Sequence, residues 1–159
     1  DCGNAARKAK HSFPFEELKH QLPPYPPNFN YDKREPEFLK KMHNGLIKFT
    51  EDWTEENWGH QAWMYYRMVE MVDANVGYIL SVLESSSDYE NTVIIFSSDH
   101  GDANGYHRML FKDNFYDTSS RVPTFVSFPK AFKKGRIDDS HLVSGLDFFP
   151  TFCLSLIHI

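Results

Sequence analysis

The chain has 159 residues, the size of one ordinary domain, and its composition is that of a globular protein, with 41% hydrophobic and 25% charged residues. Its formal net charge is -5 and it has no run of Lys and Arg, so it offers a nucleic acid no basic surface. The longest continuous apolar runs are about five residues, whereas a membrane-spanning helix needs roughly 20. We therefore expect neither a nucleic-acid partner nor a membrane span.

Residues 1–52 are predicted to form a proline-rich segment that wraps around the rest of the domain. The stretch LPPYPPNF at residues 22–29 is rich in proline, which favours an extended polyproline conformation. A ligand for an SH3-type domain is the alternative. The aromatic residues between the prolines favour packing along the flank of a domain.

Residues 57–84 are predicted to form a long amphipathic helix. Thr54 is placed to cap it, and Glu55 and Glu56 suit the positive end of its dipole. Gly77 costs about 1 kcal/mol relative to Ala inside a helix, which predicts close packing on a neighbour there. Apolar residues at alternating steps of four and three draw one stripe along the helix. They are Trp58, Ala62, Tyr65, Val69, Val72, Val76, Ile79 and Leu83.

Residues 92–98 are predicted to form a strand, because they are short, β-branched and almost continuously apolar. Such a run is typical of a strand buried on both faces of a parallel sheet. A second strand is expected at 124–128, then a turn at 133–135 and a helix at 146–154, which can hold Pro150 only by starting near it or by kinking. Helix, buried strand and polar loop in this order indicate an α/β fold.

Polar and charged side chains gather directly after the first strand. Asp99 and His100 are placed at its carboxyl end, where reactive groups of open α/β sheets collect, and both residue types can bind one divalent ion. A loop with His107 and Arg108 follows, and then Lys112. A divalent cation, a lysine and imidazole groups together suit an oxyanion whose charge is spread over several oxygens. Taken alone, the Asp-His-Gly tripeptide also suits a helix cap or a salt-bridged histidine.

Several short blocks follow one another between Trp53 and Thr151. They are Asp73-x-x-x-Gly77, Asn91-Thr92, Ser97-Ser98-Asp99-His100-Gly101-Asp102, Gly105-x-His107-x4-Lys112, Arg121-Val122-Pro123 and Gly145-Leu146-Asp147-x2-Pro150-Thr151. In order and in spacing, these blocks resemble the sulfatase family of the alkaline-phosphatase superfamily. The Pro-rich stretch with Asn28-Phe29 and Glu35-Pro36-Glu37 is similar to the bacterial-type glycan sulfatases of that family.

The resemblance implies a fold and an activity. The fold would be a partial alkaline-phosphatase-like sandwich, a mostly parallel sheet flanked by helices. Residues 1–159 would be the C-terminal part of one catalytic domain, with 53–156 as a core of helix, strand and loops that carries the metal and sulfate sites. The activity would be hydrolysis of a sulfate ester, with a sulfated small molecule or glycan as substrate. Family members are secreted, periplasmic or lysosomal, although this chain shows no targeting signal of its own.

The resemblance also implies roles for single residues. Asp99 and His100 would be two ligands of one divalent metal ion, expected to be Ca²⁺. Many members have Asn in place of His100, and an imidazole also accepts zinc or manganese. Lys112 would bind a sulfate oxygen as a catalytic residue. His107 would act with it and hold the substrate or its leaving group, and Arg108 would be a further substrate contact.

The family nucleophile is not expected within this chain. It is a formylglycine made from the first residue of a Cys/Ser-x-Pro/Ala-x-Arg motif. Cys2 does not fit, because GNAAR follows it and the Arg stands five residues on. The nucleophile, the first strands and the remaining metal ligands are expected upstream of residue 1, so the isolated piece should be inactive.

Two other functions remain open from the sequence. A phosphodiesterase or phosphonate hydrolase of the same superfamily would use the same Asp-His pair. A non-catalytic remnant or binding module would keep the fold without the chemistry. The sequence gives no signal for an oligomeric state.

Overall fold

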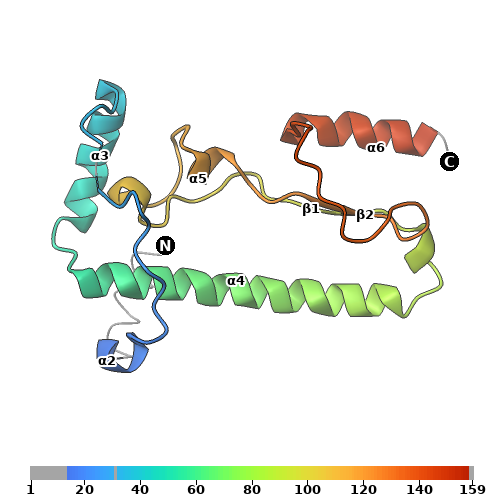
Figure 1. Cartoon of the computed structure of the whole chain (residues 1–159), viewed down its shortest axis with the longest axis horizontal. Coiled ribbons are helices and arrows are strands. Elements are labelled where there is room, and N and C mark those ends of the chain that lie inside the picture. The colour runs from blue at the N-terminus through green and yellow to red at the C-terminus, as the bar shows by residue number, and fades with distance from the viewer. Residues whose placement is uncertain (1–13, 31, 158–159) are drawn as a thin grey trace. The chain divides into compact units, whose positions relative to one another are not determined.

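The structure is a computed structural model that describes residues 14–30 and 32–157, so Cys2 lies outside the described residues (Figure 1). These residues fall into two compact units. The first contains the described residues up to 87 together with 100–122, and the second contains 88–99 and the described residues from 123. The predicted grouping of 53–156 as one core stays a prediction. The elements are α2 (Phe15–Leu18), α3 (Glu37–Thr50), α4 (Glu55–Glu84), η1 (Tyr89–Asn91), β1 (Ile94–Phe96), η2 (Tyr106–Arg108), α5 (Asp117–Ser120), β2 (Phe125–Ser127), η3 (Gly145–Asp147) and α6 (Phe148–Ile157).

The long helix α4 confirms the predicted amphipathic helix and its cap. The Thr54 side chain accepts a hydrogen bond from the Asn57 backbone N–H, and the Thr54 N–H donates to Asn57 Oδ1 at 3.0 Å. This reciprocal capping box satisfies two of the N–H groups that the first turn leaves unpaired. The described part of the chain contains no helix long and apolar enough to cross a membrane.

Burial along α4 is confined to its first third. Trp58 is 7% exposed, whereas Ile79 on the same predicted stripe is 63% exposed. The close packing predicted at Gly77 is wrong, because a Cβ added there would meet no atom within 4 Å among the described residues. The stripe is therefore present over the whole helix, but only its beginning takes part in the core of the first unit.

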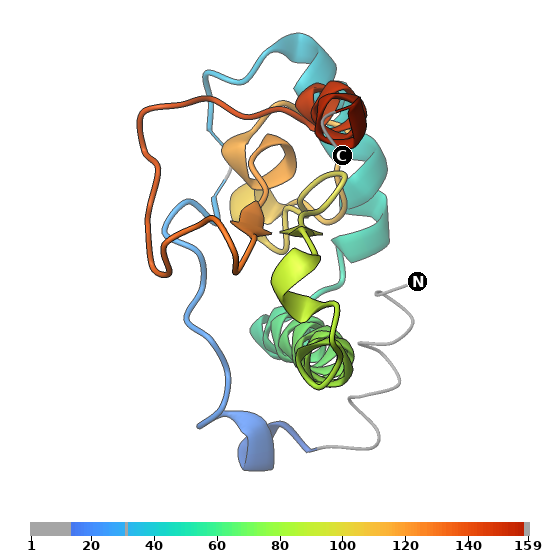
Figure 2. The same ribbon diagram turned by 90° about the vertical axis from the view of Figure 1, so that its right-hand side faces the viewer.

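The helix α3 was not predicted. It begins directly after Pro36, whose ring fixes a backbone angle suited to a helix start. Figures 1 and 2 show α3 leading away from the beginning of α4 rather than lying along it. Residues 22–26, by contrast, form neither helix nor strand, as their prolines predicted.

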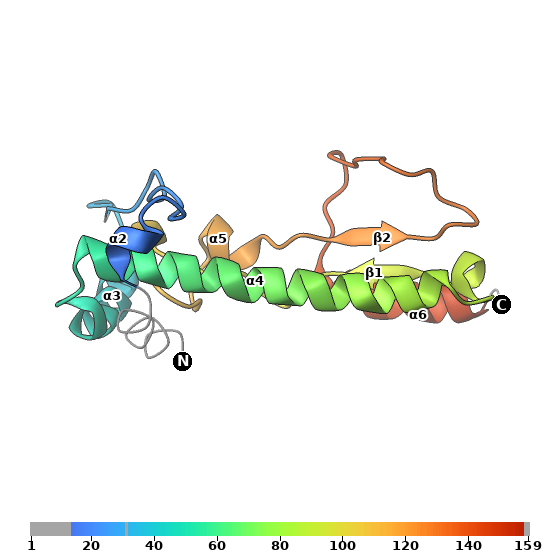
Figure 3. The ribbon, with the colours of Figure 1, turned by 90° about the horizontal axis from the view of Figure 1, so that it is seen from below.

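The second unit contains both predicted strands. They pair in an antiparallel register that places Ile95 opposite Val126 and Phe96 opposite Phe125 (Figure 3). The parallel neighbours expected beside β1 are not among the described residues. The burial on both faces predicted for this strand is not found there, because Ile94 and Ile95 are half-buried and Phe96 is exposed. Phe125 of β2 is 63% exposed.

The last part of the second unit contains the turn and the helix that the sequence predicted. A turn at Lys134–Gly135 lies in the connection that leaves β2 (Figure 3), and Gly135 has a φ of +73° that favours glycine. The helix α6 has Pro150 as its third residue, where the missing N–H has no helical partner to lose. The predicted turn and helix are both confirmed.

Candidate functional site

The predicted sulfate-binding lysine lies against the predicted metal ligand His100. Lys112 Nζ contacts His100 Nε2, and His100 Nδ1 lies 2.8 Å from the carbonyl oxygen of Gly101. A carbonyl oxygen can only accept, so Nδ1 carries the ring proton and Nε2 presents its lone pair. The ammonium group of Lys112 lies beside this lone pair.

Short backbone hydrogen bonds bring residues 100 and 112 together. Gly101 N–H donates to the Ser119 carbonyl at 2.9 Å, and Ala103 N–H donates to the Phe111 carbonyl at 2.7 Å. Gly101 approaches the neighbouring backbone so closely that a Cβ would lie 1.9 Å from the Thr118 carbonyl oxygen. A residue with any side chain would force this loop apart.

The loop between these ends is anchored by apolar side chains. Ala103, Met109 and Leu110 are all buried, and Met109 is fully inaccessible. Gly105 N–H donates to the Met109 carbonyl at 2.8 Å, and the Gly105 φ of +98° requires a glycine. The loop therefore holds its shape through packing as well as hydrogen bonds.

Left-handed backbone conformations cluster in this loop and just beyond it. Such a conformation costs a non-glycine residue roughly 1–2 kcal/mol. Conformations of this cost persist where the surroundings impose them, and they gather at functional sites. The non-glycine residues concerned are Asn104, His107, Arg108, Phe111 and Asp113.

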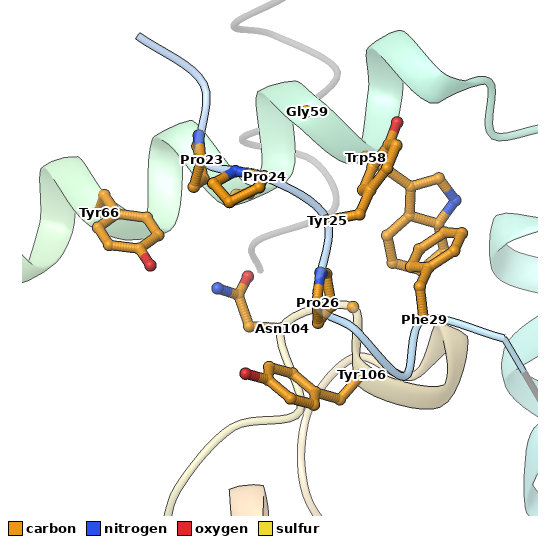
Figure 4. Close-up of a pocket in the computed structure, with 12 residues that line it drawn as sticks. Pro23, Pro24, Tyr25, Pro26, Phe29, Trp58, Gly59, Tyr66, Asn104 and Tyr106 are labelled. Carbon is orange, nitrogen blue, oxygen red and sulfur yellow. The ribbon is translucent and has the colours of Figure 1, made fainter.

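The proline-rich segment packs between α4 and this loop (Figure 4). Tyr25 Oη donates to the Glu55 carbonyl at 2.8 Å, and the Tyr25 and Phe29 rings stack at 4.9 Å. Phe29 meets the buried Trp58 edge-on at 5.3 Å. These contacts pack Tyr25 and Phe29 against the beginning of α4, and the wrapping role predicted for residues 1–52 as a whole stays a prediction. A cavity of about 80 Å³ remains, lined by Pro23, Pro24, Tyr25, Pro26, Phe29, Trp58, Gly59, Ala62, Tyr66, Asn104, Gly105 and Tyr106.

The two other predicted site residues contact the same segment. His107 N–H donates to the Asn28 carbonyl at 2.8 Å, and His107 Nε2 lies 3.0 Å from Asn28 Nδ2. The guanidinium of Arg108 stands over the Phe29 ring, 5.1 Å from its centroid. Their predicted roles toward a substrate stay predictions.

Three residues around His107 had been assigned no role from the sequence. Glu35, Asn28 and Tyr116 all contact its side chain. Asn28 and Glu35 belong to the blocks that resemble glycan sulfatases, and that resemblance is the sequence feature that could have pointed to them. Tyr116 carried no signal, because its contacts arise only when the chain folds.

Asp99 and His100 are residue types that bind divalent cations, a carboxylate and an imidazole whose Nδ1 faces the Gly101 carbonyl. Asp99 belongs to the second compact unit and His100 to the first, so each is a single candidate ligand. The described residues contain no cluster of three or more acidic, His or Cys side chains that could hold a metal. The remaining ligands would have to come from elsewhere.

Comparison with known proteins decides the family. The profile of the Sulfatase family matches residues 13–156. The chain belongs to the sulfatase family. It is 36% identical over 98 residues to the N-acetylglucosamine-6-O-sulfatase of Bacteroides thetaiotaomicron, covering 60% of this chain and 17% of that protein. It is 34% identical over 104 residues to the Delta 4,5-hexuronate-2-O-sulfatase of the same organism, covering 64% of this chain and 21% of that protein.

Solved structures agree with the family. The crystal structure of a presumed sulfatase from Bacteroides thetaiotaomicron superposes with a TM-score of 0.74 and 29% identity, over 83% of this chain and 30% of that one. The fold is thus part of an alkaline-phosphatase-like sulfatase domain, as predicted. The sulfatase chain spans about a fifth of the length of the curated relatives it matches.

Proposed function

We propose that the complete protein carrying this chain hydrolyses sulfate esters of glycans. Membership of the sulfatase family and two relatives named for sulfated sugars support this substrate class. The single observation that carries the proposal is the contact between Lys112 Nζ and His100 Nε2. That contact puts an ammonium group beside an imidazole that can bind a cation, which is what a sulfate anion needs.

The residues of this chain would act as binding and orienting groups. Lys112 would hold a sulfate oxygen through its ammonium group, and it would neutralise charge that builds up during cleavage of the ester bond. Asp99 and His100 would hold a Ca²⁺ ion. When bound, that ion would supply Lewis acidity toward the sulfate oxygens. A formylglycine nucleophile would come from outside this chain.

The loop residues after the metal ligands would contact the sugar. His107 and Arg108 lie on the strained part of the loop and are fixed by the proline-rich segment. A side chain that is fixed before the substrate arrives loses little conformational entropy on binding, which favours orientation of the substrate. We assign the two residues to substrate contact on that ground.

The test is Lys112→Ala in the complete protein, assayed on 6-O- and 2-O-sulfated sugars and on a phosphodiester. We expect kcat/KM on the preferred sulfate ester to fall by about 10²–10³-fold, the usual effect of removing one preorganised charge-stabilising group. The circular dichroism spectrum should be unchanged. The exposed Lys130→Ala is the matched control and should keep wild-type activity.

Two results would contradict the proposal. A near-normal rate for Lys112→Ala would remove this residue from the mechanism. A wild-type protein that cleaves the phosphodiester but neither sulfate ester would assign the site to the sister activity.

A further inference from the structure

Glu35 is a carboxylate that is almost completely buried. Its side chain is 4% exposed, and a buried charge is costly unless polar groups satisfy it. Tyr116 Oη donates a hydrogen bond to Glu35 Oε1 at 2.7 Å. Burial raises the pKa of the Tyr116 hydroxyl, and the hydrogen bond to Glu35 raises it further, so Tyr116 stays a proton donor.

His107 lies against the same carboxylate oxygen. His107 Nδ1 is 3.5 Å from Glu35 Oε1, and the imidazole stacks on the Tyr116 ring with centroids 4.1 Å apart and planes 7° apart. Nδ1 is buried and makes no hydrogen bond of good geometry within the described structure. The Glu35 carboxylate therefore favours a proton on that nitrogen.

The contact at the other ring nitrogen, Nε2, also indicates that the proton is on Nδ1. Asn28 Nδ2, which can only donate, lies 3.0 Å from His107 Nε2. Nε2 must then accept, which leaves the ring proton on Nδ1. The backbone N–H of His107 also donates to the Asn28 carbonyl, so one residue fixes both the backbone and the ring.

A second carboxylate, Asp32, also acts on His107 through its charge. Arg34 Nε donates to Asp32 Oδ1 at 3.0 Å, and Arg34 Nη2 donates to Asp32 Oδ2 at 2.7 Å. Both Asp32 oxygens are thus engaged by one guanidinium. Glu35 is the carboxylate that faces the imidazole.

We propose that Glu35 is a positioning residue that holds His107 with a proton on Nδ1 and with Nε2 facing a hydrogen-bond donor. This inference rests on the proposed function and names what His107 recognises. The Asn28 amide occupies the position of a substrate donor, a sugar hydroxyl or N-acetyl N–H, which replaces it at Nε2. His107 then acts as an acceptor that orients the sugar. It does not protonate the leaving group, because that step needs a proton on Nε2.

The test is the tautomer of His107 in the complete protein, labelled with ¹⁵N at histidine and recorded by long-range ¹H–¹⁵N NMR at pH 8. The His107 signal is assigned by its loss in His107→Gln. Glu35→Gln removes the charge and keeps the size of the side chain. Tyr116→Phe removes the hydrogen bond at the same oxygen but keeps the ring stack, and Glu51→Gln is an exposed control on the same segment.

The wild type should show the Nδ1-protonated form. Glu35→Gln should shift the tautomer ratio toward Nε2–H by at least about threefold, because a nearby negative charge stabilises a proton on Nδ1 and a neutral amide does not. It should also lower kcat/KM on the sulfated sugar by about tenfold, mainly through KM, because the loss concerns substrate orientation. Tyr116→Phe and Glu51→Gln should keep the wild-type tautomer.

An Nε2–H tautomer in the wild type would overturn the inference, even if Glu35→Gln failed to fold. An unchanged ratio in a folded Glu35→Gln would overturn it as well. The expected tautomers in a protein without sulfatase activity would instead refute the proposed function and leave the positioning role of Glu35 standing.

Discussion

The loop of residues 101–111 and the strand pair of β1 and β2 reverse the usual relation between composition and burial. The loop is irregular and rich in polar residues, yet it contributes three of the buried side chains of the first unit. The strands are almost continuously apolar, yet no described residue of the second unit is buried. An apolar sequence provides the driving force for burial, but the neighbours that are present decide whether it occurs.

The contrast matters for function because His100, His107 and Lys112 all belong to the unit with the buried loop. Loops carry functional residues well when a rigid surround fixes them. Here the surround consists of the proline-rich segment and the beginning of α4. We infer that the anchoring side chains of this loop serve the candidate site as much as the stability of the fold.

The largest expected effect comes from breaking the loop at its tightest contact. Gly101→Ala would place a Cβ 1.9 Å from the Thr118 carbonyl oxygen, so the two backbones must separate. We expect a loss of about 3 kcal/mol or more in the free energy of unfolding, measured by urea denaturation. Gly77→Ala is the matched control, and it should stabilise the chain by about 0.5–1 kcal/mol because its Cβ meets nothing. Equal losses in both variants would show that the loop contact is absent in solution.

A second pair of variants compares the two regions directly. Met109→Ala empties a fully buried position and should cost about 2–5 kcal/mol, whereas Phe125→Ala removes a 63% exposed ring and should cost less than about 1 kcal/mol. Urea denaturation of this chain gives both values. A larger loss for Phe125→Ala than for Met109→Ala would mean that the second unit has a core of its own.

The sequence predicted those elements whose signals are local. The cap at Thr54 depends on residues three positions apart, and the helix start near Pro150 depends on a single ring. Both are confirmed. The helix α3 was missed even though Pro36 precedes it, because its start has no side-chain cap of the kind that Thr54 provides for α4.

Structural features that depend on residues far apart in the chain could not be predicted from the sequence in the same way. Gly77 suggested close packing, but a glycine in a helix says nothing about whether a partner is there. The pairing of β1 with β2, which joins residues about thirty positions apart, required the folded chain.

The candidate site shows the same difference between features that are local in the sequence and features that depend on distant residues. The motifs pointed to His100 and Lys112, and the structure places their side chains in contact. Asn28, Glu35 and Tyr116 were not assigned, because the first two stand more than seventy residues from His107 and nothing in the spacing relates them. The metal roles of Asp99 and His100 and the substrate roles of His107, Arg108 and Lys112 stay predictions.

The smallest expected effect on the His107 tautomer comes from Arg34→Met. This variant tests whether the carboxylate of Asp32 acts on the imidazole as the buried carboxylate of Glu35 does. Arg34 holds the pKa of Asp32 at about 2, below its ordinary value, mainly through the hydrogen bond from its guanidinium. The ion pair contributes stability above the ordinary pKa, and the contribution is lost as pH falls through about 2. In Arg34→Met the carboxyl should titrate near its ordinary value, which ¹³C NMR of labelled aspartate would measure. Because water screens this exposed pair, stability at pH 7 should hardly change and the His107 tautomer should stay as in the wild type. A tautomer change in Arg34→Met would mean that Asp32, once released, competes with Glu35 for the imidazole, and the assignment of a single positioning carboxylate would then fail.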